Sequence, residues 1–167
     1  KTGTLTQNRM TVTKIFSTAS GAEEGSGNNS DAARQILTYA TLCSDGEIEF
    51  DDGETKHVGD PTETAIVLAA HNNQLDKSDL EDVSPRLAEL PFDSDRKLMS
   101  TLHVIDGAQT LIIKGAFDEM VQRCVNTSEE LAALKAAADS MSEDALRVIA
   151  VGYRTFDTEP EELDSAV

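Results

Sequence analysis

Five separated side chains have the chemistry to bind an anionic ligand that contains an aromatic base. The cations Lys97, Lys114 and Arg147 each lie on or beside an apolar run that predicts a strand, in a chain with few cations. Phe92 offers a ring on which a base can stack, an interaction worth about 1–3 kcal/mol per base. Glu63 lies at the predicted start of a helix. The spacing leaves two arrangements open. One is a common positive cleft; the other is a core phenylalanine, solvated lysines, a surface ion pair for the arginine and a helix cap for the glutamate.

Lys114 ends the apolar run Leu111-Ile112-Ile113 and is followed by Gly115 and Ala116. This pattern predicts a buried strand that brings one cation, with bare backbone beside it, to a sheet edge or a cleft. Because lysines are mostly exposed, a solvated lysine before a glycine turn is the alternative. Because Lys114 lies at the end of the predicted strand, reversal of its charge is expected to leave the core intact.

The charge of the chain limits the partners that it can bind. Its 167 residues are enough for one compact domain and include 14 Lys and Arg against 31 Asp and Glu, a formal net charge of −17. Such a surface repels nucleic acid and anionic lipid, because binding either requires neutralisation of phosphates. We therefore expect no nucleic-acid partner, and we expect a monomer.

Cysteine and histidine spacing predicts neither a disulfide nor a zinc site. Cys43 and Cys124 lie far apart without a Cys-x-x-Cys pair, which is typical of reduced thiols in a cytosolic setting. The three histidines lack the spacing of zinc ligands. No run approaches the roughly 18 apolar residues of a membrane span.

The first part of the chain predicts a strand, a loop, a helix and an acidic hairpin. Residues 10–16 are rich in β-branched side chains and predict the strand, whereas residues 17–30 have little to bury and predict the loop. The helix over residues 31–43 is expected to be capped by its first residue, an aspartate. Residues 44–59 contain an Asp-Asp-Gly sequence that suits a turn and lack EF-hand spacing, so they predict a hairpin and not a cation site.

Helix start signals recur in the rest of the chain. For a helix over residues 60–72, Asp60 is a good N-cap, Pro61 suits the first helical position, and Glu63 completes a capping box. A second capping box predicts a helix that starts at Thr127, with Glu130 as its partner and an apolar stripe through Met141. Shorter helices are predicted over residues 78–82 and 116–124.

The remaining apolar runs predict an antiparallel sheet. Strands are expected over residues 86–92, 97–105 and 109–114, and Asp106-Gly107 favours a tight turn between the last two. A final buried strand over residues 146–153 would contain Arg147. Hairpins with helices between them indicate an α+β fold, in which a mainly antiparallel twisted β-sheet is flanked by helices.

The start of the chain, Lys1-Thr2-Gly3-Thr4-Leu5-Thr6-Gln7-Asn8, resembles a known motif. It is similar to the segment directly after the phosphorylated aspartate of P-type cation-transporting ATPases, whose motif reads Asp-Lys-Thr-Gly-Thr-Leu-Thr. Further family motifs follow in the same order: Leu42-Cys43-Ser44-Asp45, Gly59-Asp60-Pro61-Thr62-Glu63, Pro91-Phe92 through Arg96-Lys97, Lys114-Gly115-Ala116, and Leu146-Arg147. The resemblance covers essentially the whole chain and is greatest to the calcium-pump (type II) branch.

The resemblance implies a nucleotide-binding (N) domain, a cytoplasmic part of an integral membrane protein. Residues 10–157 would form the domain, residues 1–9 would be a remnant of the phosphorylation loop and hinge, and residues 158–167 an acidic tail toward a second hinge. The implied ligand is ATP, with Mg²⁺ in the intact enzyme. The implied partners are the phosphorylation, actuator and transmembrane domains of the same polypeptide.

The resemblance also implies a role for residues around the base. Phe92 would stack on the adenine, and Lys114 would lie deep in the pocket beside it. Gly115 and Ala116 would permit close approach, and Glu63 would form hydrogen bonds around the adenine edge, in competition or together with its capping role.

Two cations are assigned to the phosphates by the same resemblance. Lys97 and Arg147 would contact them, Arg147 as a planar donor that is always charged. Two departures from the family pattern bear on this part of the site. Ser94 replaces an arginine that is frequent in calcium pumps, and Phe117-Asp118 replaces the commoner Pro-Glu after Lys-Gly-Ala.

In the family the γ-phosphate is transferred to the aspartate that would precede Lys1, forming an aspartyl phosphate. Without that aspartate and the later acidic motifs, this chain is expected to bind ATP and not to catalyse, so no catalytic residue or metal ligand is assigned. One alternative is a haloacid-dehalogenase-type phosphatase, although such enzymes usually have a second aspartate where this chain has Thr2. The other alternative is an acidic interaction module without a ligand.

Overall fold

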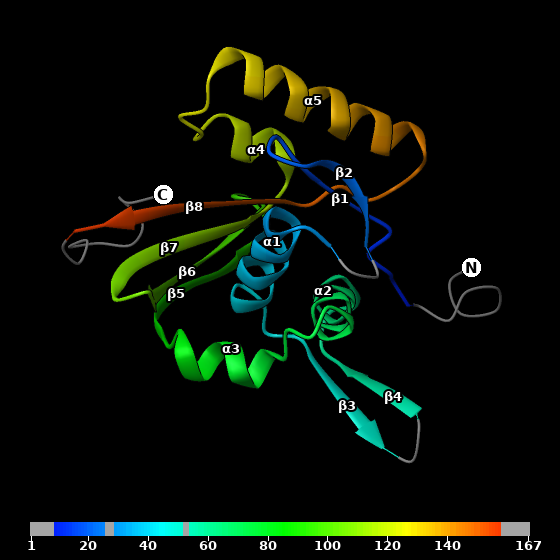
Figure 1. The fold of residues 1–167 in the computed structure, drawn as a ribbon, viewed down its shortest axis with the longest axis vertical. Helices are drawn as coiled ribbons and strands as arrows, with labels where there is room; N and C mark the ends of the chain where they lie inside the picture. The colour runs from blue at the N-terminus through cyan, green and yellow to red at the C-terminus, as the bar shows by residue number, and fades with distance from the viewer. Residues whose placement is uncertain (1–8, 26–28, 52–53, 158–167) are drawn as a thin grey trace.

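The apolar runs in the second half of the chain form the main sheet. The computed structural model describes residues 9–25, 29–51 and 54–157. Four strands pair antiparallel in chain order: β5 (Arg86–Asp93), β6 (Leu98–Ile105), β7 (Ala108–Gly115) and β8 (Ala150–Phe156) (Figure 1). Two separate two-stranded hairpins and five helices complete the described part of the chain. The predicted α+β fold with a mainly antiparallel sheet is therefore confirmed.

The central strands β6 and β7 are joined by the predicted tight turn. Asp106 and Gly107 have φ angles of 51° and 80°, the positive values that a type I′ hairpin turn requires. The turn sets a continuous register from Ile105↔Ala108 to Leu98↔Gly115. Through this register β7 brings Lys114 opposite Met99, at the end of the sheet away from the turn.

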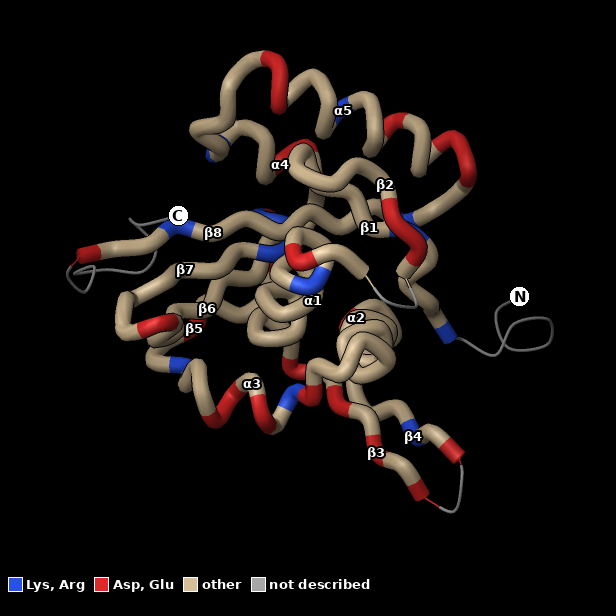
Figure 2. The backbone as a smooth tube through the Cα atoms, viewed as in Figure 1, with Lys and Arg blue, Asp and Glu red and all other residues tan. Residues whose placement is uncertain are grey.

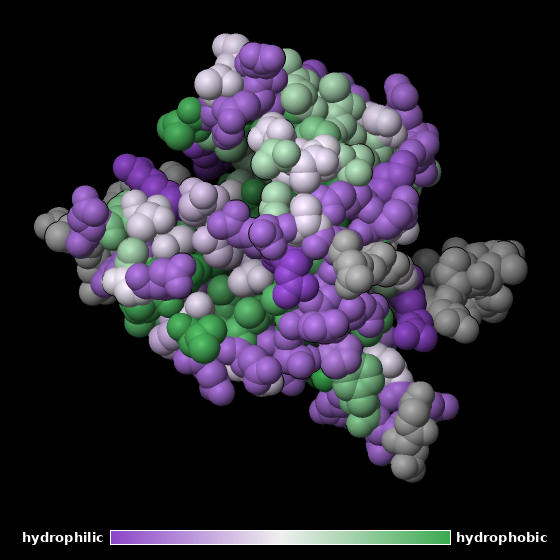
Figure 3. Space-filling view, in the orientation of Figure 1, coloured by the Kyte–Doolittle hydropathy of each residue, from purple (hydrophilic) through white to green (hydrophobic). Residues whose placement is uncertain are grey.

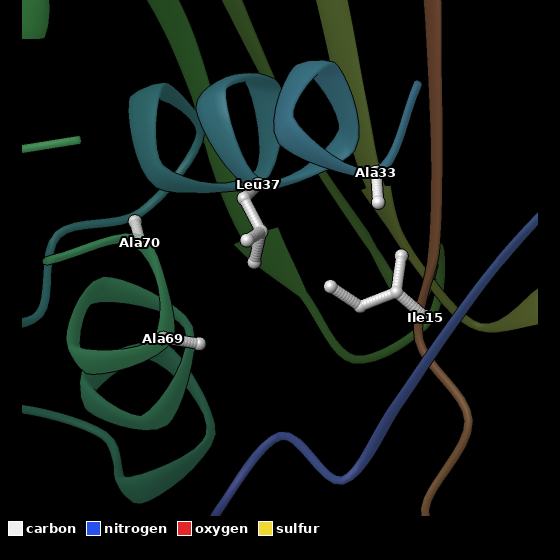
Figure 4. Close-up of a cluster of buried hydrophobic side chains, with 5 residues drawn as sticks. All are labelled: Ile15, Ala33, Leu37, Ala69 and Ala70. Atoms are coloured by element: carbon white, nitrogen blue, oxygen red, sulfur yellow. The ribbon is translucent and has the colours of Figure 1, made fainter. Parts of the chain in front are cut away.

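Two helices pack against each other, and the first of them also packs against one face of the sheet. In Figure 1, α1 (Asp31–Leu42) lies across the sheet and α2 (Pro61–Asn72) lies beside it. One cluster of buried residues joins α1, α2 and β1; its members are Ile15, Ala33, Leu37, Ala69 and Ala70 (Figure 4). A second cluster joins the end of α1 to the sheet and contains Leu42, Cys43, Met99 and Ile112. The two clusters fix α1 against α2 on one side and against the sheet on the other.

The N-terminal segment corrects two predictions. Residues 17–30 are not all loop, because β2 (Gly21–Glu24) pairs antiparallel with β1 (Lys14–Ser17). Gly21 has a φ of 76°, which suits the turn, and Ile15 is the one buried residue of the two strands. With so little apolar surface to bury, β2 has no alternating pattern in the sequence. The following helix is capped by Ser30, whose hydroxyl accepts from the Ala33 N–H at 3.2 Å, and not by its first residue.

The acidic segment after α1 forms the predicted hairpin, which consists of β3 (Glu47–Asp51) and β4 (Glu54–Val58). The hairpin projects from the body of the protein beside α2 and α3 (Lys77–Val83) (Figure 1). Figure 2 shows acidic positions along this hairpin, along α3 and along α5 (Ser128–Glu143), consistent with the large negative charge. Residues 52–53 of the predicted turn lie outside the described residues, as do residues 1–8 and 158–167.

The C-terminal part contains one confirmed capping box and one shifted strand. Thr127 and Glu130 form the predicted box at the start of α5, which follows the short helix α4 (Phe117–Val121). The last strand begins at Ala150 and not at residue 146. Ala150 pairs with Gly115, the last residue of β7, so an earlier start would have no partner strand. None of the helices in the described ranges is long and apolar enough to cross a membrane.

Candidate functional site

Lys114 is buried and is held by two oxygen atoms from elsewhere in the chain. The residue is 6% exposed. Its Nζ donates to Ser44 Oγ at 2.6 Å and to Glu63 Oε1 at 2.8 Å. A buried charge is stable only when it is paired and hydrogen-bonded, and both conditions hold here. The alternative of a solvated lysine is therefore wrong.

Glu63 contacts a neighbouring loop in place of its own helix terminus. The N-cap of α2 is Asp60, whose side chain accepts from the Thr62 N–H at 2.8 Å. The carboxylate of Glu63 accepts from the backbone N–H groups of Asp45 and Gly46 at 2.9 and 3.0 Å. The predicted capping box at Asp60 does not form, because these donors and the Lys114 ammonium hold the carboxylate on the loop side.

The loop from Ser44 to Gly46 is anchored from three directions. The first anchor is a hydrogen bond of 2.7 Å that Ser44 Oγ donates to the carbonyl of Ala40. Arg86 gives the second, since its guanidinium donates to the carbonyls of Leu42 and Ser44 at 2.9 and 3.2 Å. The third is close packing on α2, because a Cβ at Gly46 would lie 2.9 Å from the Cβ of Glu63. The backbone donors to Glu63 are therefore held in place by the fold.

Gly115 and Ala116 bring the end of β7 against the backbone of Lys97. A Cβ on Gly115 would lie 2.2 Å from the Lys97 carbonyl oxygen, so only glycine fits there. The Ala116 N–H donates to the same carbonyl at 3.1 Å. The close approach observed at this position is thus between two segments of the chain.

Lys97 lies in a turn, which corrects its predicted place on a strand. Its φ is 57°, and β6 starts at the next residue. The turn is closed by Asp93, whose carboxylate accepts from the N–H groups of Arg96 and Asp95; these bonds lower the pKa of Asp93. The Lys97 side chain is 58% exposed, and its Nζ donates to Glu119 Oε1 of α4 at 3.1 Å.

Phe92 is 63% exposed, so the alternative of a core phenylalanine is wrong. It precedes Asp93, which pairs with Leu98, and Leu98 pairs with Gly115. The register therefore puts Phe92 at the same end of the sheet as Lys97 and Gly115.

Arg147 is exposed on the segment before β8, and does not lie within a buried strand as predicted. Its guanidinium donates to Thr62 Oγ1 at 3.3 Å. Thr62 precedes Glu63 in the first turn of α2, so Arg147 and Lys114 both reach the start of this helix. The structure thus joins Lys114 directly to Glu63, places Arg147 beside them, and sets Phe92 and Lys97 at the same sheet end.

Comparison with known proteins gives the family. The model of the family described as P-type ATPase, cytoplasmic domain N, matches residues 32–166. The chain belongs to this family. The expected resemblance is therefore confirmed, and the motifs from Leu42 to Arg147 lie within the matched residues.

Relatives of this N domain are calcium and cation pumps. It is 39% identical to a calcium-transporting ATPase of Listeria monocytogenes, over 98% of this chain and 20% of the relative. It is 36% identical to calcium-transporting ATPase 1 of Bacillus cereus, over 98% of this chain and 19% of the relative. A cation-transporting ATPase of Synechocystis is 28% identical over 98% of this chain and 21% of its own length. The chain thus spans about a fifth of the length of these relatives.

Two hollows on the surface of the N domain lie away from the predicted residues. One, of about 320 Å³, lies between the β1–β2 hairpin and α5, where Figure 3 shows apolar surface over α5. The other, of about 440 Å³, lies between β3, α2 and α3. Among the described residues, no three or more His, Cys, Asp or Glu side chains are grouped so that they could hold a metal ion.

Sequence reasoning missed two contacts of the predicted residues. Ser44 lies within a family motif but was assigned no role, although it contacts Lys114 directly. Glu119 was not singled out, although it pairs with Lys97. Neither contact has a local sequence signal, because the partners are 70 and 22 residues apart.

Proposed function

We propose that this N domain binds ATP and, in the intact pump, presents its γ-phosphate to the aspartate that precedes Lys1 in the family motif. The observation that supports this most is the buried pair of Lys114 and Glu63. Burying an ammonium and a carboxylate contributes little to stability in itself, so such a pair is better explained by a ligand that both groups recognise.

The donor and acceptor sites that remain on this pair fit a nucleobase. An ammonium has three donors and a carboxylate about four acceptor sites. Lys114 donates two described hydrogen bonds and the Glu63 carboxylate accepts three, which leaves each group one further site. Adenine presents a donor and acceptors on neighbouring atoms, so it matches an acceptor beside a donor.

The other residues would complete a nucleotide site around this pair. Phe92 would stack on the adenine, and Gly115 and Ala116 would border the base. Lys97 and Arg147 would contact the phosphates, and Mg²⁺ would be held by those phosphates and by carboxylates of the adjoining domain. Positioning of the phosphates, rather than chemistry by this domain, would be its contribution to catalysis.

The intact protein would be an ATP-driven cation pump of calcium-pump type, in which this chain is a cytoplasmic domain of an integral membrane protein. Its partners would be the phosphorylation, actuator and transmembrane domains. The chain itself would be a monomer without ATP turnover and would bind no nucleic acid. The family match leaves no support for the phosphatase alternative.

Calorimetric titration of the chain with ATP, with and without Mg²⁺, tests the proposal. We expect weak saturable binding that Mg²⁺ strengthens by less than about tenfold, roughly 1.4 kcal/mol, because base contacts dominate. Lys114→Glu should abolish binding. The control is Lys135→Glu on α5, which makes the same charge change at an exposed site; Lys77 is unsuitable, since it donates to the Gly46 carbonyl. No binding at millimolar ATP would favour the acidic interaction module, and equal losses in both variants would indicate long-range electrostatics.

A further inference from the structure

Ser44 is a buried hydroxyl that contacts the most deeply buried cation of the proposed site. The residue is fully buried, at the end of α1. Its Oγ lies 2.6 Å from Lys114 Nζ and 2.7 Å from the carbonyl oxygen of Ala40. An ammonium can only donate and a carbonyl can only accept. The hydroxyl proton must therefore point to Ala40, and a hydroxyl lone pair must point to Lys114.

The same short loop contacts both members of the ion pair. Ser44 binds the ammonium of Lys114 through its side chain, while the next two backbone N–H groups bind the carboxylate of Glu63. Arg86 holds the carbonyls of Leu42 and Ser44, so the loop cannot easily move away. The orientation of the ammonium is thus set by two fixed oxygen atoms, one from the loop and one from α2.

We propose that Ser44 is a positioning residue for nucleotide recognition. It does not contact the nucleotide; its hydroxyl orients the Lys114 ammonium so that the remaining N–H faces the base. This inference rests on the proposed function. Without the hydroxyl, Glu63 is the one described hydrogen-bond partner left to the ammonium, and the donor that faces the base loses its fixed direction.

A purely structural role for Ser44 has a matched comparison within the chain. Ser142 Oγ donates to the Ala138 carbonyl at 2.8 Å, an i to i−4 bond near the end of α5 that is less buried than that of Ser44 and involves neither Lys114 nor Glu63. Ser142→Ala therefore measures what loss of such a helix-end bond does to stability alone. Ser44→Ala removes the equivalent bond together with the contact to Lys114.

The decisive measurement is the preference of the chain for ATP over GTP. Adenine has an amino donor where guanine has a carbonyl acceptor, so a fixed Lys114–Glu63 pair should reject GTP. We expect Ser44→Ala to weaken ATP binding about tenfold, to change GTP binding less than about twofold, and thus to lower the preference. Ser142→Ala should lower the thermal midpoint and leave both affinities unchanged. Ser44→Cys keeps the size of the side chain with a weaker acceptor, and it has the same expected result if Ser44→Ala does not fold.

A double-mutant cycle tests whether Ser44 acts through Lys114. In a Lys114→Met background, Ser44→Ala should change ATP affinity less than about twofold, because the group that it positions is gone. A tenfold loss in that background, or an unchanged ATP preference in both Ser44 variants, would overturn the inference. If Lys114→Met alone left ATP binding intact, the proposed site itself would fail. If Lys114→Met does not fold, the ratio of ATP affinity to GTP affinity in the Ser44 variants still tests the inference.

Discussion

Lys114 and Lys97 lie near the same end of the sheet, yet the protein holds them in opposite ways. Lys114 is buried at the end of a strand between Ser44 and Glu63. Lys97 is exposed in a turn and pairs only with Glu119 among the described contacts. We call Ser44, Glu63 and Lys114 the inner region, and Phe92, Lys97 and Arg147 the outer region. Contacts from other parts of the chain hold the inner region, whereas Phe92 and Lys97 of the outer region are largely exposed.

The difference follows from solvent. An exposed ion pair gains only about 0–1 kcal/mol, since water screens it and the side chains lose freedom. A buried pair loses its hydration, so removal of one partner leaves an uncompensated charge that costs about 3–5 kcal/mol. Changes in the inner region should therefore affect folding and binding together, and changes in the outer region should affect binding alone.

The largest expected effect is that of Lys114→Met on stability. Removal of the Lys114 ammonium leaves the Glu63 carboxylate buried without its cation. This should lower the free energy of unfolding by about 3–5 kcal/mol. This revises the expectation that a change at the strand end spares the core. Urea denaturation of Lys114→Met and Lys97→Met measures the contrast, and Lys97→Met should cost less than about 1 kcal/mol. Similar losses in the two variants would remove the distinction between the regions.

Phe92→Ala should have the next largest effect, on binding only. Loss of the stacking ring should weaken ATP binding by about 1–3 kcal/mol. Because most of the ring is exposed, the unfolding free energy should change by less than about 0.5 kcal/mol. Phe50→Ala is the matched control, since Phe50 is 55% exposed and packs on His71 in the hairpin region. A comparable loss of ATP affinity in the control would contradict a role for Phe92 in stacking.

The stability of the folded protein should also depend on pH, through the buried side chain of His103. This residue is fully buried on β6, opposite Arg86, and its Nδ1 lies 2.9 Å from the Ser84 carbonyl oxygen. Burial lowers its pKa below the ordinary 6.5 and outweighs the hydrogen bond to Ser84, which raises it. The charge of Arg86 lowers the pKa further, and that of Glu81 opposes this. Below pH 6.5 the unfolded chain therefore binds a proton that the folded chain does not. Stability should fall by up to about 1.4 kcal/mol per pH unit from there down to the folded pKa.

The measurement is the unfolding free energy between pH 7.5 and 5.5 for the natural chain and for His103→Gln. The variant should be less stable at pH 7.5 and should lose less on acidification. Parallel curves would mean that another group causes the acid sensitivity.

The smallest effect should come from Glu119→Gln. Without this carboxylate, Lys97 has no described ion-pair partner. It could then contact the phosphates without first breaking an ion pair. We expect ATP affinity to rise by no more than about fivefold, within the range of exposed ion pairs, and adenosine affinity to stay the same. Glu129→Gln on α5 controls for the change in net charge. An equal gain in the control would show that the acidic surface, and not Glu119, limits binding.

The elements that sequence predicted well are those decided by neighbouring residues. Asp106-Gly107 determined a hairpin turn because positive φ angles are needed at both positions. Thr127 and Glu130 determined a helix start because the side chain of each accepts a hydrogen bond from the backbone N–H of the other. The run before Lys114 determined a buried strand by its apolar content. The family motifs, which depend only on order along the chain, likewise determined the family.

Tertiary structure decided what depends on a distant partner. Arg147 lies outside β8 because a strand can extend only where β7 pairs with it. Glu63 forms no capping box with Asp60, because its carboxylate accepts hydrogen bonds from a loop and a lysine in other parts of the chain. Lys114 looks like a solvated lysine until the fold brings Ser44 and Glu63, 70 and 51 residues away, against its ammonium. A side chain's charge is set by its own chemistry, but whether that charge can be buried is set by the groups that the rest of the chain brings to it.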